Sequence, residues 1–352
     1  MELYVGLDVS QAKTAICVVD AEGRRVWQGC CQSTPQAIAH RIRRKAPEAV
    51  GIGMETGMLS GWLWHELHKM QFPVVCLHAR AVAAALSLQV NKTDANDAFG
   101  LAQIVRTGWY REVEVKSLES HRVRSLLRAR HHLVGVRTSL YNQIRGLLKT
   151  FGVVLGPGKG ATFEQLVRGS MPEDGCVRVV VESLLTTWKS VSEELFQLNR
   201  RVAVLAQASE VCRRLMTVPG VGPVTAVAFV TAIDNPRRFV RSRDVGAYLG
   251  LTPRRYQSGE VDRAGHISKC GDRMVRSLLF EAANVILTRL RRPCALGIWA
   301  ARLAGRSGGP KAKVALARKL AVILHKLWVE GGTFRWESMP EEEGTVIATT
   351  SC

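Results

Sequence analysis

The chain has 352 residues and carries 49 Lys and Arg against 30 Asp and Glu, a formal net charge of +19. That length allows two or three domains with a real core. The charge favours a polyanionic partner, with nucleic acid the first candidate and a merely basic or ribosome-associated protein the alternative. No run of about 18 uncharged apolar residues predicts a membrane span.

The sequence shows neither a signal peptide nor a disulfide framework, the two features expected of a secreted protein. The first residues, MELYVGLDVS, lack the basic and apolar regions of a signal peptide. Nine scattered cysteines include no CxxC pair, which argues against a disulfide framework or a zinc site. The composition therefore favours a reduced cytosolic protein with no membrane partner.

Residues 1–112 predict an α/β domain. Five short apolar runs predict strands, and two segments with helical spacing lie between the last three; in chain order the strands are LYVGLDVS, TAICVVD, RRVWQGCC, AVGIGMET and PVVCLHA. The helix TPQAIAHRIRRKA has a threonine in N-cap position, and SGWLWHELHKM is the second helix. Strand-strand-strand-helix-strand-helix-strand is the order of a ribonuclease H-like sheet, although other α/β folds share pieces of it.

Residues 113–215 predict long helices separated by the glycine-rich break FGVVLGPGKGAT. Apolar residues in the second half recur in alternating steps of three and four: Val181, Leu184, Trp188, Val191, Leu195, Leu198, Val202 and Leu205. This heptad pattern predicts a coiled coil that joins chains. An ordinary helical hairpin within one chain has the same pattern, so both readings stay open.

Residues 216–335 predict a third, mostly α-helical unit, and residues 336–352 an acidic, disordered tail. Gly220 and Gly222 precede an apolar helix, as in a helix-hairpin-helix turn that presents backbone N–H groups to a DNA phosphate. A purely structural turn is the alternative. The stretch LGLTPRRYQSGEVDRAGHISKCGD that follows predicts a long polar loop, and loops of that length are usually functional.

Two basic amphipathic helices are expected after this loop. Between and within them lies a set of cations, Arg302, Arg306, Lys311 and Lys313. They predict contacts with RNA or DNA backbone, with a solvated charged face as the alternative.

Four carboxylates stand where strands end or a helix begins. Asp8 lies at the end of the first strand and Glu55 at the end of a later one. Asp94 and Asp97 are three apart, so on a helix they share one face, with Cβ atoms about 5–6 Å apart. Like charges that close repel unless a proton or cation lies between them. Mg²⁺ resolves the conflict, because it takes carboxylate oxygens and keeps waters for a substrate phosphate.

In a ribonuclease H-like sheet these four side chains would converge, and two metal ions there would clamp a scissile phosphate. Three of the acids also have a structural alternative. Asp94 fits a helix N-cap, Asp97 a first-turn acid, and Glu55 a surface acid at a strand end.

Ser258 stands beside Arg254, Arg255 and Tyr256 in TPRRYQSGE. A serine hydroxyl is a weak nucleophile unless a base or metal activates it, and the nearest histidine, His266, is eight residues on. Arginines suit a phosphodiester because they bind its oxygens and stabilise developing charge. The composition therefore favours phosphate chemistry over acyl transfer, with a turn serine as the alternative.

Two motif sets occur in order along nearly the whole chain. The N-terminal part carries GLDVS, METG and NKTDANDA, and the C-terminal part carries VPGVGPVTA, FVRSRDVGAYLGLTPRRYQSG and SKCGDRMVRSLLFEAA. On these motifs the sequence resembles the insertion-sequence one-hundred-ten family of DEDD transposases, which includes the Piv-type DNA invertases.

The resemblance implies roles for five residues. It implies a RuvC-like domain whose acidic tetrad, Asp8, Glu55, Asp94 and Asp97, holds Mg²⁺ or Mn²⁺ at the scissile phosphate. It implies that Ser258 attacks DNA and leaves a covalent phosphoserine link. Arg254, Arg255 and Tyr256, which lie beside this nucleophile in the sequence, would then position the phosphate. Such an exchange conserves the phosphodiester bond, so no ATP is needed, and the chain has no Walker motif.

The resemblance also implies partners. The expected partners are the DNA of element ends and target, a bridge RNA encoded by the element, and further copies of the chain. A dimer or tetramer would be joined by the coiled coil, with the acidic domain of one protomer meeting the serine domain of another. The expected location is the cytoplasm of a bacterium or archaeon, at the nucleoid.

Three other functions are compatible with the sequence, and two of them make different demands on these residues. A metal-only RuvC-like nuclease or Holliday junction resolvase would activate water with the tetrad and would not need Ser258. A catalytically idle protein would bind nucleic acid in a salt-sensitive way and cut nothing. A Piv-like DNA invertase would share all the chemistry and differ only in the surrounding DNA.

Overall fold

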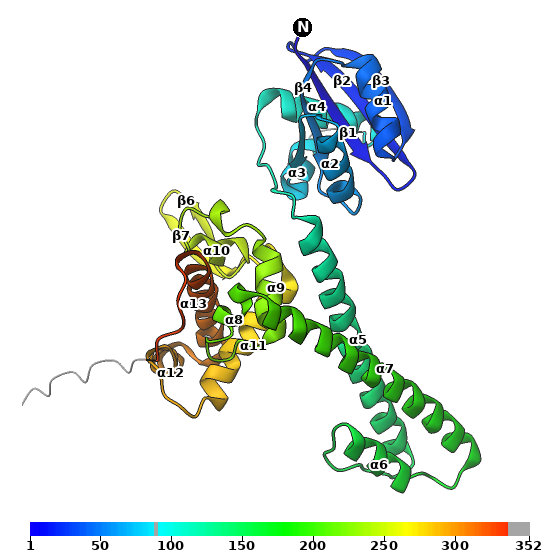
Figure 1. Cartoon of the computed structure of the whole chain (residues 1–352), viewed down its shortest axis with the longest axis vertical. Coiled ribbons are helices and arrows are strands. Elements are labelled where there is room, and N and C mark those ends of the chain that lie inside the picture. The colour runs from blue at the N-terminus through cyan, green and yellow to red at the C-terminus, as the bar shows by residue number, and fades with distance from the viewer. Residues whose placement is uncertain (88–90, 337–352) are drawn as a thin grey trace, which may run out of the picture. The chain divides into compact units, whose positions relative to one another are not determined.

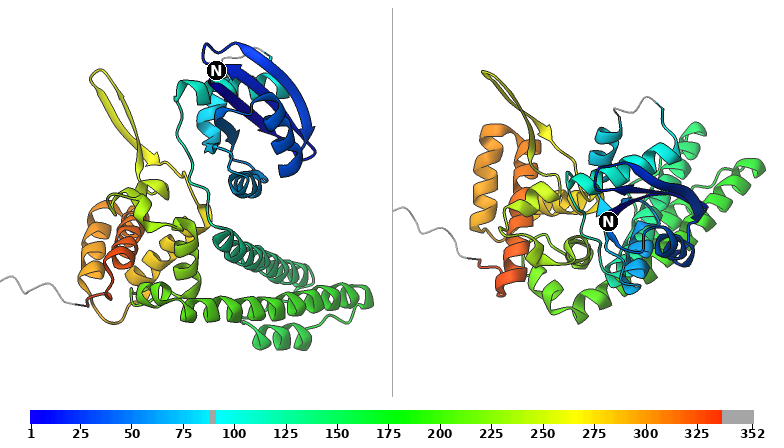
Figure 2. Two further views of the ribbon diagram at one scale, coloured as in Figure 1. Left: turned by 45° about the horizontal axis from the view of Figure 1, so that its top comes forward. Right: turned by 90° about the horizontal axis from the view of Figure 1, so that it is seen from above.

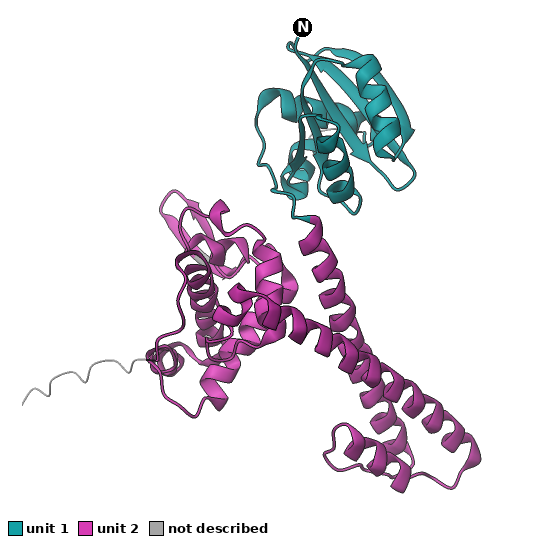
Figure 3. Ribbon diagram, viewed as in Figure 1, with its two compact units in different colours: residues 1–117 teal, residues 118–352 magenta. Residues whose placement is uncertain are grey.

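The computed structural model describes residues 1–87 and 91–336, and Figure 1 labels their helices and strands. The chain divides into two compact units, residues 1–117 and 118–352 (Figure 3). The acidic tail expected from residue 336 onward lies, apart from Trp336, outside the described residues.

Unit 1 is built on one five-stranded mixed sheet. Its strands are β1 (Leu3–Val9), β2 (Lys13–Asp20), β3 (Arg25–Gln32), β4 (Ala49–Glu55) and β5 (Val74–Leu77), in the order β3-β2-β1-β4-β5. The first three strands pair antiparallel, and β4 and β5 continue the sheet parallel to β1. The predicted order of five strands and two intervening helices is therefore confirmed.

Four helices cover the two faces of this sheet: α1 (Pro35–Lys45), α2 (Ser60–Lys69), α3 (Ala79–Leu86) and α4 (Asp94–Thr107). Thr34 caps α1 by accepting a hydrogen bond from the backbone N–H of Ala37, as its N-cap position predicts. The helices α1 and α2 pack on the face that carries Val5 and Leu7 of β1. The helix α4 packs on the opposite face, where Ala98 and Ala102 meet β2.

Two glycines allow α4 to lie directly against the sheet. A Cβ atom at Gly6 of β1 would lie 2.0 Å from the carbonyl oxygen of Ala98, and one at Gly53 of β4 would lie 2.2 Å from Cγ2 of Val105. Any larger residue at these two places would force the helix away. The position of the first turn of α4 relative to the strand ends therefore depends on Gly6 and Gly53.

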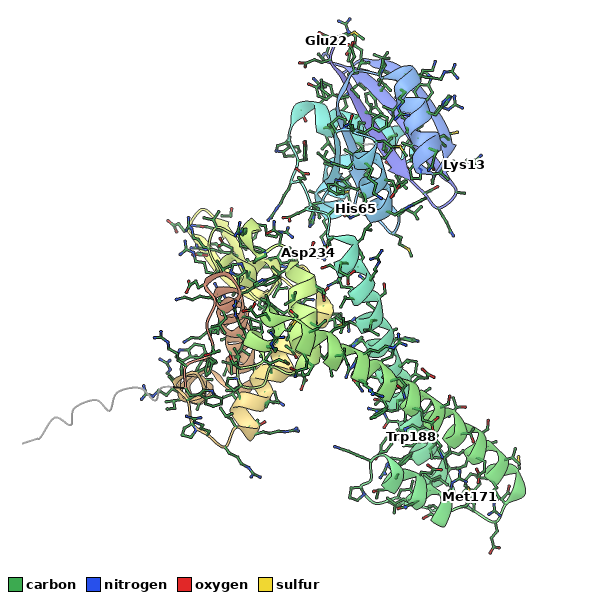
Figure 4. All side chains as sticks on the ribbon, viewed as in Figure 1. Lys13, Glu22, His65, Met171, Trp188 and Asp234 are labelled. Atoms are coloured by element: carbon green, nitrogen blue, oxygen red, sulfur yellow. The ribbon has the colours of Figure 1, made fainter. Side chains whose placement is uncertain are left out.

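Unit 2 begins with a helical hairpin. The long helices α5 (Leu118–Thr150) and α7 (Gly175–Ala208) pack side by side, with the short α6 (Ala161–Gly169) between them in the chain. Arg130 of α5 donates a hydrogen bond to Asn199 of α7 over 2.6 Å. Trp188, labelled in Figure 4, packs against Phe163 of α6, with ring centroids 5.0 Å apart.

The predicted heptad seam is buried on one side only. Alternate members are buried within the chain: Val181, Trp188, Leu195 and Val202. The intervening members are half-buried or exposed: Leu184, Val191, Leu198 and Leu205. The first set fills a hairpin within one chain, which is one of the two predicted readings.

The rest of unit 2 is a helical core with one small sheet. Its elements are α8 (Glu210–Leu215), α9 (Pro223–Ile233), the 3-10 turn η1 (Pro236–Arg238), α10 (Asp244–Tyr248), β6 (Pro253–Ser258), β7 (Val261–Ile267), α11 (Arg273–Arg289), α12 (Ala295–Ser307) and α13 (Gly309–Glu330). In the described part of the chain no helix is long and apolar enough to cross a membrane.

The prediction of a long polar loop after α10 is wrong. Residues 253–267 form an antiparallel hairpin, and Figure 2 shows β6 and β7 projecting from the helices of unit 2. All six residues of β6 are exposed, so neither face of the strand needs apolar side chains. Gly259, at φ +54°, occupies the first position of the two-residue turn, where such hairpins favour glycine.

A buried ion pair ties α5 to the start of α11. Arg124 of α5 donates to the carboxylate of Asp272, and both side chains are largely buried. The same carboxylate caps α11 by accepting from the N–H of Val275. Burial opposes ionisation, but these hydrogen bonds outweigh it and lower the pKa of Asp272 below its usual value.

We expect Arg124→Ala to destabilise unit 2 by about 3–5 kcal/mol, because it leaves the buried Asp272 carboxylate without its cation. The matched control is Arg122→Ala, which breaks an exposed ion pair with Glu119 on the same helix and should change stability by about 1 kcal/mol at most. Urea unfolding followed by circular dichroism at the helical band measures both. Equal losses in the two variants would contradict a structural role for the buried pair.

Candidate functional site

Strand register places Asp8 and Glu55 together on the α4 face of the sheet. β1 and β4 run parallel with Leu7 opposite Met54, so the next residues, Asp8 and Glu55, lie at the carboxyl ends of neighbouring strands. Side chains alternate between faces along a strand. Because Gly6 faces α4, Asp8 faces α4 as well, and the same parity holds for Glu55 after Gly53.

The first turn of α4 supplies the other two carboxylates. Thr93 caps the helix by accepting a hydrogen bond from the N–H of Asn96 over 3.2 Å. Asp94 and Asp97 follow in the first turn, on one helix face. The alternative reading of Asp94 as the N-cap is therefore wrong, while a favourable contact of both acids with the helix dipole holds.

The electrostatics show that all four carboxylates share one neighbourhood. Burial raises the pKa of Asp8 to about 6, with further contributions from repulsion by Asp97, Asp94 and Glu55. Burial also raises the pKa of Glu55, and Asp97 adds to that rise. Lys92 opposes both shifts, so its ammonium group is close enough to be felt by Asp8 and Glu55. The sequence alone allows Lys92 to contact a nucleic-acid backbone or to be a solvated lysine, and neither expectation placed it beside these carboxylates.

A pocket opens among these groups. It has a volume of about 250 Å³ and is lined by Glu55, Asp97 and Lys92, together with Ala83, Leu86 and Ser87. Among residues 1–87 and 91–336, no set of three or more His, Cys, Asp or Glu side chains is arranged to hold a metal ion. The donors that surround the pocket are nevertheless hard oxygens, which suit Mg²⁺ or Mn²⁺ and not a soft metal.

Ser258 is the last residue of the exposed strand β6 and pairs with Val261 across the turn. Its hydroxyl is therefore at the tip of the hairpin. His266 lies at the other end, because the register pairs Pro253 with Ile267. The nearest histidine in sequence is thus not a base for Ser258 within this hairpin.

The three neighbours of Ser258 differ in their surroundings. Arg255 forms a two-pronged ion pair with Asp262 of β7, with Nε 2.8 Å and Nη2 2.5 Å from the two carboxylate oxygens. Arg254 donates to the carbonyl of Ser268 over 3.3 Å, and Tyr256 is 66% exposed. A phosphate would have to compete with Asp262 for Arg255. Asp262 was not predicted as a partner of Arg255. The sequence gives one sign of the pair: Asp262 follows the turn at Gly259 at a spacing that places it on the strand opposite Arg255.

Gly220 has a structural reason to be glycine. Its φ is +78°, and a Cβ atom there would lie 2.6 Å from the carbonyl oxygen of Ala282 in α11. Gly222 precedes α9 as its N-cap, has open space at its Cα and is half-buried. Packing accounts for the first glycine, and a phosphate contact by either backbone stays a prediction.

Lys311 and Lys313 begin α13. Lys311 is exposed, whereas Lys313 is half-buried with Nζ 6.0 Å from the ring centroid of Phe280. The first is free to meet a phosphate at the surface, and the second is directed toward an aromatic face.

The raised pKa of Asp8 predicts how stability depends on pH in metal-free protein. An unfolded Asp titrates near 3.9, so between about pH 4 and 6 the folded chain binds more protons than the unfolded chain. Stability therefore falls as pH rises through this window. We expect Asp8→Asn to remove that fall and to be more stable than the wild type at pH 7.5 by about 1–2 kcal/mol, after allowance for partial exposure.

Urea unfolding in a chelator at pH 4.5 and 7.5 measures this difference. Glu48→Gln, which removes an exposed acid of the same unit, serves as the control. An Asp8→Asn variant whose stability follows the wild-type pH profile would contradict the shared carboxylate site.

Comparison with known proteins covers both units. A family model for DEDD transposases of the IS110 type, described as a transposase, matches residues 5–152. A second, described as the transposase IS116/IS110/IS902 family, matches residues 212–297. The first match includes all four carboxylates, and the second includes Ser258.

Individual relatives agree with the family models. The chain is 33% identical to the transposase for insertion sequence element IS1111A of Coxiella burnetii, over 70% of this chain and 69% of that protein. It is 29% identical to a Pseudomonas aeruginosa protein named a probable family 20 transposase, over 92% and 96% of the two chains. It is 23% identical to the pilin gene-inverting protein of Moraxella bovis, over 80% and 82%. With both halves matched in order, the chain belongs to the IS116/IS110/IS902 family of transposases and is a DNA transposase.

Proposed function

We propose that this transposase cuts and rejoins DNA through a phosphoserine intermediate at Ser258, assisted by a divalent metal ion at Asp8, Glu55, Asp94 and Asp97. The observation that carries the proposal is the gathering of four carboxylates from β1, β4 and α4, with the pKa of Asp8 raised to about 6. Burial and repulsion at that level disfavour a site without a cation.

The fold of unit 1 supports the acidic half of the proposal. Its strand order, its three antiparallel leading strands and its two parallel trailing strands agree with the order expected for a ribonuclease H-like sheet and so support the RuvC-like part of the proposal. In that arrangement the carboxyl end of the central strand carries an acid beside the crossing helix. Asp8 of β1 and the first turn of α4 occupy these places.

Mg²⁺ or Mn²⁺ at the four carboxylates would neutralise their repulsion and polarise a phosphoryl oxygen. The chain's own groups hold the ion and orient the substrate. The tetrad carries four negative charges when ionised, and Lys92 in the same pocket supplies one positive charge to a phosphate oxygen.

Ser258 fits a nucleophile that must reach a polymer backbone. Its Oγ forms a bond to phosphorus while the bond from phosphorus to the leaving sugar oxygen breaks, and the hydroxyl proton passes to that oxygen through solvent. One phosphodiester linkage replaces another, so the reaction needs no external energy source. The exposed tip of the hairpin leaves the hydroxyl accessible.

Partners follow from charge and from the free surface of the helical hairpin. Four members of the heptad seam, spaced seven residues apart on one face of α7, are not fully buried within the chain, and they support a dimer or tetramer joined by coiled-coil packing of this helix: Leu184, Val191, Leu198 and Leu205. The net charge of +19 supports a bridge RNA that pairs with donor and target DNA. The eight described cysteines are all free, which suits the reducing cytoplasm.

A second candidate function is site-specific DNA inversion. The similarity to the Moraxella bovis pilin gene-inverting protein over 80% of this chain favours it. Inversion and transposition would use the same residues, and the arrangement of sites on the DNA would decide between them.

The phosphoserine step is tested with purified protein, a divalent metal ion, the RNA that flanks the element and labelled element-end DNA on a denaturing gel. We expect label to stay with the wild-type protein and with Gln257→Ala, a control on the same exposed strand. Ser258→Ala and Asp94→Ala should each lower this product by about a thousand-fold or more.

The rival metal-only nuclease makes the opposite prediction for the same gel. It requires free cleaved DNA that persists in Ser258→Ala, and that result would overturn the serine mechanism while leaving the tetrad in place.

The metal site has a test that does not depend on DNA. We expect Mg²⁺ at about a hundred times its dissociation constant to stabilise the folded chain by about 2–3 kcal/mol, because the ion binds only the gathered carboxylates. Asp94→Asn should lose most of this stabilisation, and Glu22→Gln, an exposed acid of the same unit, should keep it. Thermal melts with and without Mg²⁺ measure this stabilisation. Equal shifts of the melting temperature in Asp94→Asn and Glu22→Gln would refute binding at the tetrad.

A further inference from the structure

Unit 2 contains a large groove at the base of the β6–β7 hairpin. Its volume is about 910 Å³, near the upper end of the roughly 300–1,000 Å³ range of small-molecule pockets. It lies between the hairpin base, represented by Pro253 and Ile267, and one face of α13, with Trp299 of α12 at its side. Neither the tetrad nor Ser258 lines it.

The rim of the groove is strongly basic. Five permanent cations line it: Arg243, Lys269, Lys311, Arg318 and Lys319. Within residues 1–87 and 91–336, no Asp or Glu is among the lining residues. Five cations without a lining carboxylate repel one another, and a polyanion relieves that repulsion.

The floor of the groove is apolar and aromatic. Leu251, Ile267, Val314 and Val322 line it together with Trp299. The ring of Trp299 holds the ammonium of Lys319 over its face, 4.1 Å from the centroid. A duplex presents phosphates, sugars and base edges at its surface, but its base faces are stacked inside the helix and cannot lie on such a floor. Unpaired bases can, because they stack on aromatic rings while basic side chains follow the backbone.

The position of the groove favours DNA as the occupant. Pro253 at its edge begins β6, and Ser258 ends the same strand. At about 3.4 Å per residue the serine stands about 17 Å from the groove edge, a distance of a few nucleotides. A strand attacked by Ser258 therefore needs only a few nucleotides to reach the basic rim.

We infer that this groove binds an unpaired DNA strand that flanks the phosphate attacked by Ser258. Lys311 and Lys319 contact its phosphates, and Trp299 stacks on one of its bases once Lys319 moves to a phosphate. The inference rests on the proposed function of Ser258, and it adds a place where the opened substrate is held.

Fluorescence anisotropy tests it on the full chain in a chelator, where no strand transfer occurs. The probe is a labelled twelve-nucleotide oligothymidylate, and a duplex of equal length and an oligouridylate are the comparisons. The charge variant is Lys311→Glu with Lys319→Glu. Its matched control is Lys149→Glu with Lys159→Glu, two exposed lysines of the same unit away from the groove.

We expect the groove variant to bind oligothymidylate at least ten-fold more weakly than the wild type, with the slope of log affinity against log salt reduced by about 1.4. The control changes the net charge of the chain by the same amount, so any loss of affinity that the two double variants share is due to net charge. The ten-fold weakening and the smaller salt slope should appear only in the groove variant. Trp299→Ala should weaken binding about ten-fold, and Trp299→Phe should restore most of it, because any aromatic ring stacks. Thermal melts confirm that each variant folds.

Equal affinities of the groove variant and its control would overturn the inference. So would a Trp299→Ala variant that binds duplex and single strand with the same loss, since the groove would then follow a duplex backbone. Tighter binding of oligouridylate with the same dependence on Trp299 would assign the groove to RNA and overturn the DNA occupant. If no label stays with the protein on the denaturing gel while DNA binding still depends on the groove residues, the phosphoserine mechanism is refuted and the groove remains a DNA-binding site.

Discussion

The close contact between α4 and the sheet is the constraint on which the acidic site depends. Gly6 and Gly53 leave no Cβ in the way, so the backbone of α4 lies directly over β1 and β4. Strand parity then turns Asp8 and Glu55 toward the helix, and the cap at Thr93 starts the helix beside them. The absence of a Cβ atom at these two glycines is therefore a condition for the acidic site, because a displaced α4 would move Asp94 and Asp97 away from Asp8 and Glu55.

This packing holds like charges together at a free-energy cost. Burial and three neighbouring acids raise the pKa of Asp8 to about 6, so at neutral pH its ionised carboxylate is less stable in the folded unit than in the unfolded chain, where water solvates it. Lys92 offsets part of the repulsion. A divalent cation at the proposed site would offset more of this repulsion, and its binding would then add to the stability of the folded unit.

How far the sequence predicted the structure depends on what each pattern could distinguish. The strand order was predictable because apolar runs mark the strands. Two of the four acids stand at strand ends and two begin one helix, so their grouping could also be expected, while their role stays a prediction. Residues 253–267 were not predictable, because a hairpin exposed on both faces has no alternation to detect. The seam through Val181 and Trp188 predicted packing but not its partner, since a hairpin and a coiled coil require the same heptads. The groove draws on residues from Arg243 to Val322, which only the fold brings together.

The two units supply complementary chemistry. Ser258 offers a nucleophile at an exposed tip, with His266 at the far end of its hairpin and Arg255 already paired with Asp262. Such a hydroxyl needs charge stabilisation from outside the hairpin. In the proposed reaction, a metal ion held by the carboxylates of unit 1 would stabilise the charge that develops on the phosphate. These carboxylates would not themselves form the covalent bond to DNA. The proposed phosphoserine reaction therefore needs groups from both units, the hydroxyl of Ser258 and the carboxylates of unit 1.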